Sequence, residues 1–256
     1  LKRYARLTLD VSSKGMTGEL QTSFRPRPQG QESLDQIRER VGPDEFRSQR
    51  ALVIGGSRGL GEVVAKVVSA GGGSVRLSYN LGRQDAERVA WELGNETRAV
   101  RLDVTNATDT EIAAVNNGFD ATHVYYFGSP RISFDQSPNF NDVQFAEYSR
   151  FYVTGLVRLV RVLRSRDGAK MKVFFPSTSF IDAPVPGALE YIAAKAAGEA
   201  ACRALALEPN AEFLVHRLPQ LTTDQTMNIL EVQGTDPVPL MLEVVQAMNV
   251  IQAHCP

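Results

Sequence analysis

Cysteine and histidine are scarce in this chain of 256 residues, which has two cysteines and three histidines. The cysteines, Cys202 and Cys255, are too few for a disulfide framework and do not have the spacing of metal ligands. We therefore expect no metal site. A reducing, cytoplasmic compartment is the default expectation for such a chain, and no signal-peptide pattern follows Leu1.

The sequence also lacks an excess of charge of either sign and any long apolar run. The formal net charge is -1, so charge gives no reason to expect a nucleic acid or an anionic membrane as partner. No apolar run approaches the roughly eighteen residues that a membrane span needs. With 43% hydrophobic and 22% charged residues, the composition is ordinary for a globular protein with one sizeable core.

The N-terminal part of the chain differs from the rest. Residues 4–11 and 18–24 alternate between polar and apolar side chains on either side of Lys14-Gly15, which predicts a β-hairpin. A short amphipathic helix is predicted over residues 32–41. Because an isolated two-stranded ribbon is marginal in water, we expect it to pack on the main domain, a second subunit or a domain outside this chain. We interpret residues 1–48 as an extension, with the tail of a preceding module as one explanation, and residues 49–256 as the main domain.

From residue 50 onward, predicted strands and helices alternate. The predicted strands cover residues 51–56, 74–80, 97–105, 122–128, 170–179 and 211–219. The predicted helices cover residues 61–72, 85–94, 109–116, 150–165, 190–208 and 239–253. Such alternation is typical of a parallel sheet with helices on both faces. The predicted fold class is therefore α/β, a Rossmann-like doubly wound sheet with an N-terminal β-hairpin extension.

A glycine-rich loop directly follows the first strand of this sheet and reads Gly55-Gly56-Ser57-Arg58-Gly59-Leu60-Gly61. Without a Cβ, glycine lets the chain turn sharply and lets a pyrophosphate approach the backbone. The helix that follows offers free N–H groups and the positive end of its dipole to phosphates. A merely structural turn is the alternative, but the position between a strand and a helix favours a dinucleotide site.

The end of the second strand bears on the choice between NAD and NADP. A carboxylate there would bind the ribose 2′-hydroxyl, but the sequence after Ser78 has none before Asp85. Arg58 and Arg83 can instead donate to a 2′-phosphate, so we predict NADP(H). The alternative is that either arginine is a solvated surface residue.

Asp103 ends the third strand at the carboxyl edge, where such sheets bind ligands. We expect it either beside the adenine or as the cap of a turn, with no preference between the two.

Tyr191 and Lys195 lie four residues apart, so they project from the same face of the helix after the fifth strand. That strand ends in Ser177-Thr178-Ser179. Because strand ends and helix starts meet at one edge of a parallel sheet, these groups are expected to converge. A ketone that accepts a hydride also needs a proton, and an ammonium lowers the pKa of a nearby phenol. Tyr191 would then donate the proton, Lys195 would tune it, and Thr178 or Ser179 would hold the carbonyl oxygen.

These residues resemble the short-chain dehydrogenase/reductase family, particularly its NADPH-dependent 3-oxoacyl (carrier-protein) reductases, over about residues 50–226. The family's loop, Thr-Gly-x-x-x-Gly-x-Gly, is matched at Gly55, Gly59 and Gly61, with Ile54 in place of threonine. The resemblance implies that Tyr191 and Lys195 are catalytic, and the family's usual spacing favours Thr178 slightly over Ser179. It also implies a homo-oligomer, most simply a dimer, that forms through the two long helices.

The residues expected to bind the cofactor are Gly55, Ser57, Arg58, Gly59, Leu60, Gly61, Asn80, Arg83, Asp103, Val104, Gly128, Lys195, Pro219 and Thr222. Several positions depart from the family pattern. Its Asn-Asn-Ala-Gly appears as Tyr125-Tyr126-Phe127-Gly128, and the asparagine that lines a proton-relay water in many members aligns with Tyr152. The usual last strand is not predicted here.

The sequence therefore predicts an NADPH-dependent carbonyl reductase, with a 3-oxoacyl thioester, free or carrier-bound, as one substrate class. The departures at Tyr125, Tyr126 and Tyr152 support an alternative, an NADP-binding scaffold or sensor with little or no turnover. An epimerase or dehydratase of the extended relatives ranks last, because little chain follows Pro219 to form a substrate domain.

Overall fold

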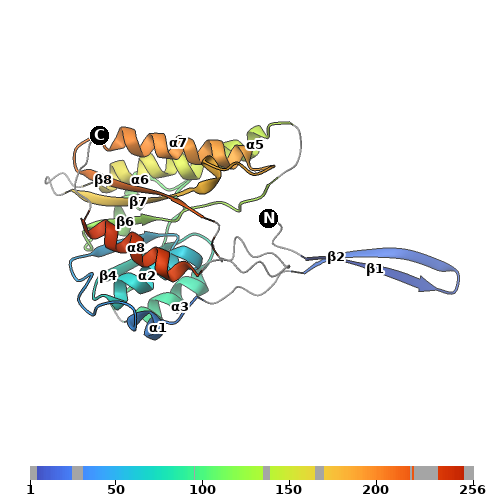
Figure 1. Ribbon diagram of the computed structural model, residues 1–256, viewed down its shortest axis with the longest axis horizontal. Coiled ribbons are helices and arrows are strands. Elements are labelled where there is room, and N and C mark those ends of the chain that lie inside the picture. The colour runs from blue at the N-terminus through green and yellow to red at the C-terminus, as the bar shows by residue number, and fades with distance from the viewer. Residues whose placement is uncertain are drawn as a thin grey trace.

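The computed structural model describes residues 5–24, 31–94, 96–134, 139–164, 170–219, 221 and 236–250. Within them a six-stranded sheet has the order β5-β4-β3-β6-β7-β8, and every neighbouring pair is parallel (Figure 1). Its strands are β3 (Arg50–Ile54), β4 (Ser74–Tyr79), β5 (Arg98–Arg101), β6 (His123–Tyr126), β7 (Met171–Thr178) and β8 (Ala211–Leu218). The strand order reverses between β3 and β6, which is where doubly wound sheets bind their ligands. The predicted fold class is confirmed.

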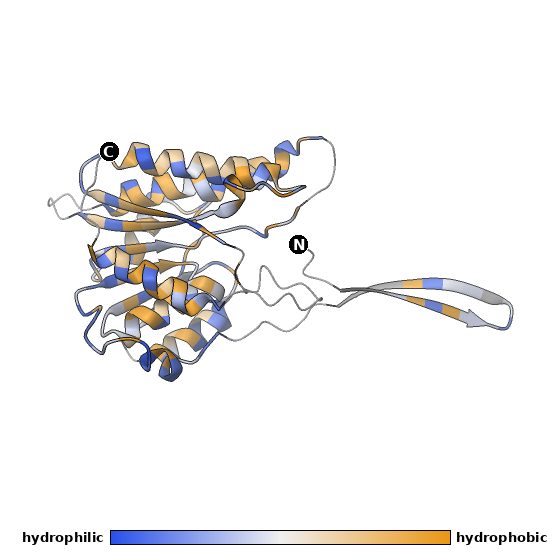
Figure 2. Ribbon diagram, in the orientation of Figure 1, coloured by the Kyte–Doolittle hydropathy of each residue, from blue (hydrophilic) through white to orange (hydrophobic). Residues whose placement is uncertain are grey.

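The helices form a layer on each face of the sheet (Figure 1). One layer contains α1 (Leu34–Arg38), α2 (Gly59–Ala70), α3 (Arg83–Leu93) and α8 (Pro237–Val250). The other contains α4 (Asp109–Asn116), α5 (Asp142–Ser149), α6 (Leu156–Leu163) and α7 (Leu189–Leu205). In Figure 2 the helix ribbons carry hydrophobic and hydrophilic residues in alternation, and the buried hydrophobic residues of the two helix layers form two cores with the sheet.

The sheet residues alternate between two cores, as the period of two in a β-strand requires. In β3, Val53 packs into the core beneath α2 and α8, whereas Leu52 packs into the core beneath α6 and α7. Tyr125 and Tyr126 divide in the same way, and both are almost fully buried. Two aromatic residues that replace the family's asparagines are therefore core residues of opposite faces.

The N-terminal hairpin forms a sheet of its own, with β1 (Ala5–Ser13) antiparallel to β2 (Met16–Phe24) (Figure 1). Its turn contains Gly15 at a φ of 87°, a left-handed conformation that glycine adopts without strain. The predicted hairpin is confirmed. Leu9 and Leu20 are register partners and lie about half exposed on the ribbon.

The helical segment before β7 differs from the single helix predicted over residues 150–165. It begins earlier with α5, whose N-cap Asn141 accepts a hydrogen bond from the amide of Gln144. It then passes through a π-helical turn, η1 (Arg150–Gly155), before α6. The sequence of α5 has little amphipathic pattern, so periodicity did not reveal it. π-turns of this kind occur frequently at functional sites.

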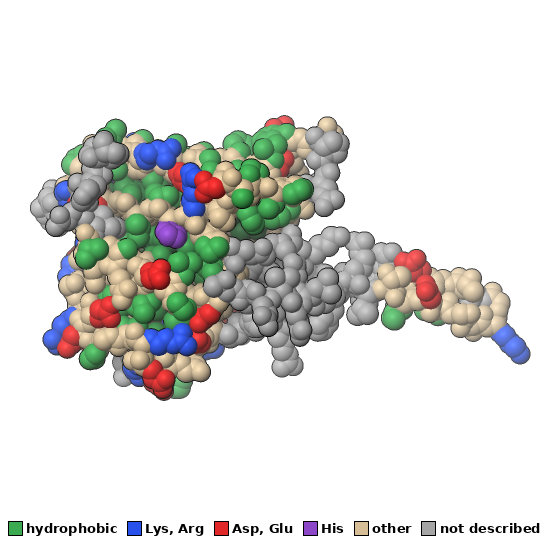
Figure 3. Space-filling view, viewed as in Figure 1, with side chains coloured by type: hydrophobic (Ala, Val, Ile, Leu, Met, Phe, Trp, Pro, Cys, Tyr) green, Lys and Arg blue, Asp and Glu red, His purple; other side chains and the backbone are tan. Residues whose placement is uncertain are grey.

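No helix in the described part of the chain is both long and apolar enough to cross a membrane. On the face drawn in Figure 3, acidic and basic side chains of the described residues lie interspersed, without a continuous patch of one sign. The surface therefore agrees with the near-neutral composition.

Candidate active site

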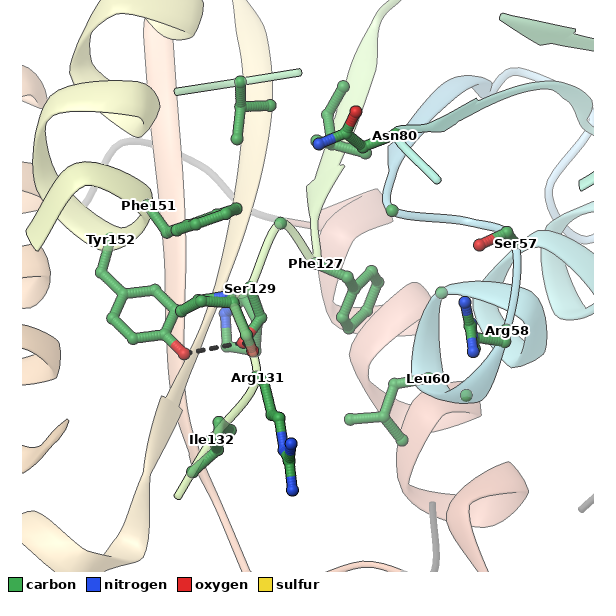
Figure 4. A pocket seen from close by; sticks show the side chains of 18 of the residues that line it. Ser57, Arg58, Leu60, Asn80, Phe127, Ser129, Arg131, Ile132, Phe151 and Tyr152 are labelled. Atoms are coloured by element: carbon green, nitrogen blue, oxygen red, sulfur yellow. Dashed lines mark hydrogen bonds between the residues drawn. The ribbon is translucent and has the colours of Figure 1, made fainter. Parts of the chain in front are cut away.

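A cavity of about 550 Å³ lies at the carboxyl edge of the sheet, where β3, β4, β6 and β7 end. It brings together most of the residues singled out from the sequence, namely Gly55, Ser57, Arg58, Gly59, Leu60, Gly61, Asn80, Asp103, Val104, Gly128, Thr178, Tyr191, Lys195 and Pro219. In Figure 4, the loop that carries Ser57, Arg58 and Leu60 forms one wall, and Phe151 and Tyr152 stand on the other.

The glycine loop closes tightly against its neighbours. Gly55 has a φ of 77°, and a Cβ there would lie 2.9 Å from the carbonyl oxygen of Phe127. A Cβ on Gly61 would lie 2.4 Å from the carbonyl oxygen of Gly55, far closer than atoms can pack. Both positions therefore require glycine, because the loop, the first turn of α2 and the end of β6 pack backbone to backbone.

The N-terminus of α2 faces this cavity without a side-chain cap. Its N-cap residue, Arg58, is extended at a φ of -166° and makes no capping hydrogen bond. The first N–H groups of a helix have no partner within the helix and carry the positive end of its dipole. Since the glycines also leave room for close approach, the residues present fit the pyrophosphate of a dinucleotide.

Two predicted donors near the second strand have different environments. Arg58 lines the cavity, and its Nε lies 3.8 Å from a carboxylate oxygen of Asp85. Arg83, in contrast, lies on the exposed face of α3, where its Nε donates to Glu87 at 2.7 Å. Arg83 does not line the cavity, so the structure gives no support to a contact from this residue, and its role stays a prediction. The distance of Arg83 from the strand end in the sequence could not show in which direction its side chain points at the start of α3.

Asp103 lines the cavity and caps a turn as well. It accepts hydrogen bonds from the amide and hydroxyl of Thr105 and from the side-chain amide of Asn106. Partial burial pushes the pKa of Asp103 up, but the hydrogen bonds from Asn106, Thr105 and Asn80 outweigh it and hold the pKa below its usual value. β5 ends at Arg101, four residues before the predicted boundary, and the turn capped by Asp103 follows it.

The catalytic candidates converge where α7 passes the end of β7. Tyr191 is 8% exposed and shares a hydrogen bond with Thr178. Lys195, one turn further along α7, is 6% exposed, and its ammonium donates to the carbonyl oxygen of Pro176 at 2.6 Å. Tyr191, Lys195 and Thr178 all line the cavity.

The expected effect of Lys195 on the tyrosine is not found. Burial raises the pKa of Tyr191 to about 12, and the hydrogen bond with Thr178 only partly opposes that rise. Burial lowers the pKa of Lys195 to about 7. The ammonium lies 5.9 Å from the centroid of the Tyr191 ring, so desolvation decides both values. Burial, rather than the ammonium, therefore sets the pKa of Tyr191 in this arrangement, and the role of Lys195 beside the tyrosine with cofactor bound stays a prediction.

Another predicted residue, Ser179, does not line the cavity. It is the first residue of a short 3-10 helix, η2 (Ser179–Ile181). Of the two hydroxyls considered, Thr178 is therefore the one that the structure places in the cavity. Thr222 lies outside the described residues.

The structure adds residues that sequence reasoning did not select. Ser129 lines the cavity, and its hydroxyl lies 2.8 Å from the hydroxyl of Tyr152 (Figure 4). Arg131 and Ile132 follow on the same segment and lie at the opening between the two walls (Figure 4). Their position directly after β6 was an available signal, because loops at this edge of the sheet form the ligand site.

Comparisons with known proteins agree with this geometry. The family model described as short chain dehydrogenase matches residues 49–215, whereas none of the curated proteins matches the chain. Solved structures share the fold. A short chain dehydrogenase from Burkholderia cenocepacia, in complex with NADP, is 17% identical with a TM-score of 0.70, and the match covers 80% of this chain and 91% of that one.

Two further solved structures are similar. A dehydrogenase/reductase from Sinorhizobium meliloti is 19% identical with a TM-score of 0.69, covering 77% of this chain and 86% of that one. An alternative dihydrofolate reductase from Brucella suis, in complex with NADP, is 16% identical with a TM-score of 0.68, covering 79% and 88%. At these identities the structural likeness shows the fold, and the family model extends over well over half of the sequence. The chain belongs to the short-chain dehydrogenase family.

Proposed function

We propose that the protein is an NADPH-dependent carbonyl reductase in which Tyr191 donates the proton to the carbonyl oxygen. One observation carries the proposal: Tyr191, Lys195 and Thr178 line the same cavity as the glycine loop and the uncapped end of α2. When bound, NADPH supplies the hydride that reaches the carbonyl carbon. The chain's own residues have to orient the ketone and provide the proton.

The pKa values suit reduction better than oxidation. With a pKa of about 12, Tyr191 is protonated at neutral pH and can give its proton to an alkoxide, which is far more basic than a phenolate. Thr178 can donate a hydrogen bond to the same oxygen as negative charge develops on it. The pKa of Lys195 is about 7, so its protonated form is available near neutral pH to return a proton to the tyrosine.

NADPH is proposed rather than NADH because of the residues around the end of β4. Arg58 and Asn80 line the cavity there and can donate to a 2′-phosphate. Asp85, the nearest carboxylate in the sequence, is paired with Arg58. The NADP complexes of two proteins with this fold are consistent with this choice.

The proposed substrate class is a ketone on a flexible acyl chain, with a 3-oxoacyl thioester as the first compound to test. The wall beyond Tyr191 is apolar and aromatic, with Ile132, Phe134, Phe151 and Phe180 in the lining. Such side chains bind hydrocarbon through the hydrophobic effect. Thr178 supplies a hydroxyl next to Tyr191 for the carbonyl oxygen.

The test is NADPH oxidation, followed by absorbance, with a panel of 3-oxoacyl thioesters and simple ketones. We expect turnover of at least one compound, and a loss of about a thousandfold in kcat for Tyr191→Phe with little change in NADPH affinity. Because Tyr191→Phe retains the ring and its packing, a loss of activity in this variant reports the missing hydroxyl rather than a change of fold. Tight NADPH binding without turnover of any compound would support the scaffold alternative, and equal activity of Tyr191→Phe would overturn the mechanism.

A further inference from the structure

Tyr152 stands where the resemblance places an asparagine, and its ring is fixed at both ends. It lies in the π-helical turn η1 and is 1% exposed. Its hydroxyl lies 2.8 Å from the hydroxyl of Ser129, and its ring stacks on Tyr148 with 6.1 Å between the centroids and 15° between the planes. The face of the ring therefore has a defined direction.

That direction is toward the ammonium of Lys195. The Lys195 Nζ lies 4.0 Å from the centroid of the Tyr152 ring, 4.9 Å from that of Phe175 and 5.9 Å from that of Tyr191. We call these three rings the aromatic cage. The face of an aromatic ring attracts a cation within about 6 Å of its centroid, most strongly where the cation is desolvated.

The cage depends on a glycine in α7. A Cβ on Gly198 would lie 2.6 Å from the Phe175 ring and 2.8 Å from the carbonyl oxygen of Tyr152. The Phe175 ring and the backbone of η1 at Tyr152 thus approach α7 so closely only because residue 198 has no side chain. The backbone around η1 and the sequence of α7 together place the ring over the ammonium.

The charged groups near Lys195 are occupied elsewhere. Glu199, one turn along α7, accepts hydrogen bonds from Ser177 at 2.6 Å and from Arg217 of β8 at 2.8 Å. Among the described residues, no carboxylate lies within ion-pair distance of the Lys195 Nζ. Burial raises the pKa of Cys202 to about 12, so this neighbouring thiol stays neutral. The charge of Glu199 also favours protonated Lys195, but the ring faces and the Pro176 carbonyl are the groups in direct contact with the ammonium.

We propose that Tyr152 is a positioning residue, whose ring face holds the Lys195 ammonium charged and in place beside Tyr191. The consequence for turnover rests on the proposed function: Lys195 remains able to return a proton to Tyr191 near neutral pH. Burial alone acts against this, since it lowers the pKa of Lys195. The ring offsets part of that cost, while the hydroxyl of Tyr152 serves to orient the ring through Ser129.

The direct test is the titration of Lys195 in the full-length chain by NMR with 13C-labelled lysine, the signal being assigned through its loss in Lys195→Met. Tyr152→Leu removes the ring face but keeps an apolar side chain, and Tyr152→Phe keeps the ring face but loses the hydroxyl. We expect the pKa of Lys195 to fall by about one unit, a tenfold change in proton affinity, in Tyr152→Leu. In Tyr152→Phe it should stay within about 0.3 of the original.

Tyr148→Leu is the matched control. It removes an aromatic ring of the same cluster, which stacks on Tyr152 and lies edge-on to Tyr191, but Tyr148 is not a member of the aromatic cage. We expect it to leave the pKa of Lys195 within about 0.3 of the original, because the Ser129 hydroxyl and the buried surroundings still hold the Tyr152 ring in place. An unchanged titration in Tyr152→Leu, or an equal fall in Tyr148→Leu, overturns the proposal. Should Tyr152→Leu not fold, as judged by circular dichroism, Tyr152→Met makes the same comparison.

Kinetics give a second readout. With a substrate in hand, the pH limb of kcat that reports Lys195 should move in Tyr152→Leu in the same direction as the NMR titration, and not in Tyr148→Leu. A loss of kcat without movement of that limb would indicate a merely structural role and overturn the proposal. Because the titration needs no substrate, absence of turnover would refute the proposed function and leave the role of Tyr152 to be decided by NMR.

Discussion

The two walls of the cavity are built on different principles. The wall around the glycine loop is made of backbone: Gly55 and Gly61 allow β3, α2 and the end of β6 to touch, and the amides of α2 point to the cavity. The opposite wall is made of large side chains, with Tyr148, Tyr152 and Tyr191 in mutual ring contact. The first wall has no room to vary without loss of the fold. The second depends on the packing of side chains, and Tyr152 stands there at the position where the resemblance places an asparagine.

The largest effect is expected from the backbone wall. In Gly61→Ala the new Cβ would lie 2.4 Å from the carbonyl oxygen of Gly55, so the loop has to move at a cost of several kcal/mol, about 3 or more. We expect NADPH binding, measured by its fluorescence, to be lost.

Gly42→Ala is the control for that substitution, because its Cβ would meet only the side chain of Glu45 at 3.5 Å. It should leave NADPH affinity unchanged. Normal NADPH affinity in Gly61→Ala would show that the loop does not constrain the cofactor site.

The next effect concerns a residue at the edge of the sheet away from the cavity. Burial lowers the pKa of His123 to about 4, below its value in the unfolded chain of about 6.5. Between these values the unfolded state binds the proton and the folded state does not, so stability is lost as the pH falls from about 6.5 to about 4. At about 1.4 kcal/mol per pKa unit, the difference between the folded and unfolded pKa of His123 corresponds to a loss of about 3 kcal/mol in the free energy of unfolding.

Urea unfolding at pH 7 and pH 4.5 measures this change, with His123→Gln as the variant that cannot titrate. The free energy of unfolding should fall between pH 7 and pH 4.5, and this fall should be smaller in His123→Gln by most of that value of about 3 kcal/mol. At pH 7, His123→Gln and the unaltered protein should bind NADPH with nearly the same affinity, because His123 does not line the cavity. An identical pH dependence in His123→Gln would contradict the assignment.

A smaller effect is expected within the side-chain wall. Thr178→Ala removes the hydroxyl that lines the cavity and shares a hydrogen bond with Tyr191, and we expect kcat/KM to fall about a hundredfold. Ser179→Ala removes a hydroxyl one residue later that does not line the cavity and should change kcat/KM less than about threefold. The reverse order of the two variants would mean that η2 rearranges when substrate binds.

The smallest effect concerns cofactor choice. Arg58→Ala should reduce the preference for NADPH over NADH by about tenfold, the value of one charge-assisted contact at a partly exposed site. Arg83→Ala should leave the preference unchanged, because Arg83 pairs with Glu87 on the exposed face of α3. Measured Kd values for both cofactors decide this. A larger effect of Arg83→Ala would show that α3 turns toward the bound cofactor.

The sequence by itself determined the order of strands and helices except for α5, and it determined the glycine loop and the pairing of Tyr191 with Lys195, because these follow from local rules. Alternation of apolar residues predicts a strand, glycine is needed where backbones touch, and four residues span one helical turn. Even the hairpin followed from alternation and from Lys14-Gly15.

Only the tertiary structure decided which side chains reach the cavity and what charge they carry. Arg83 and Ser179 each lie one residue from a position that lines the cavity, namely Gly82 and Thr178. No local sequence pattern reports the direction of a side chain at the end of an element. The pKa values of Tyr191 and Lys195 are set by burial, which depends on rings contributed by η1 and β7 as well as by α7. Desolvation depends on how segments far apart in the sequence pack together. Spacing along the chain could therefore predict that Tyr191 and Lys195 lie together, but not their pKa values.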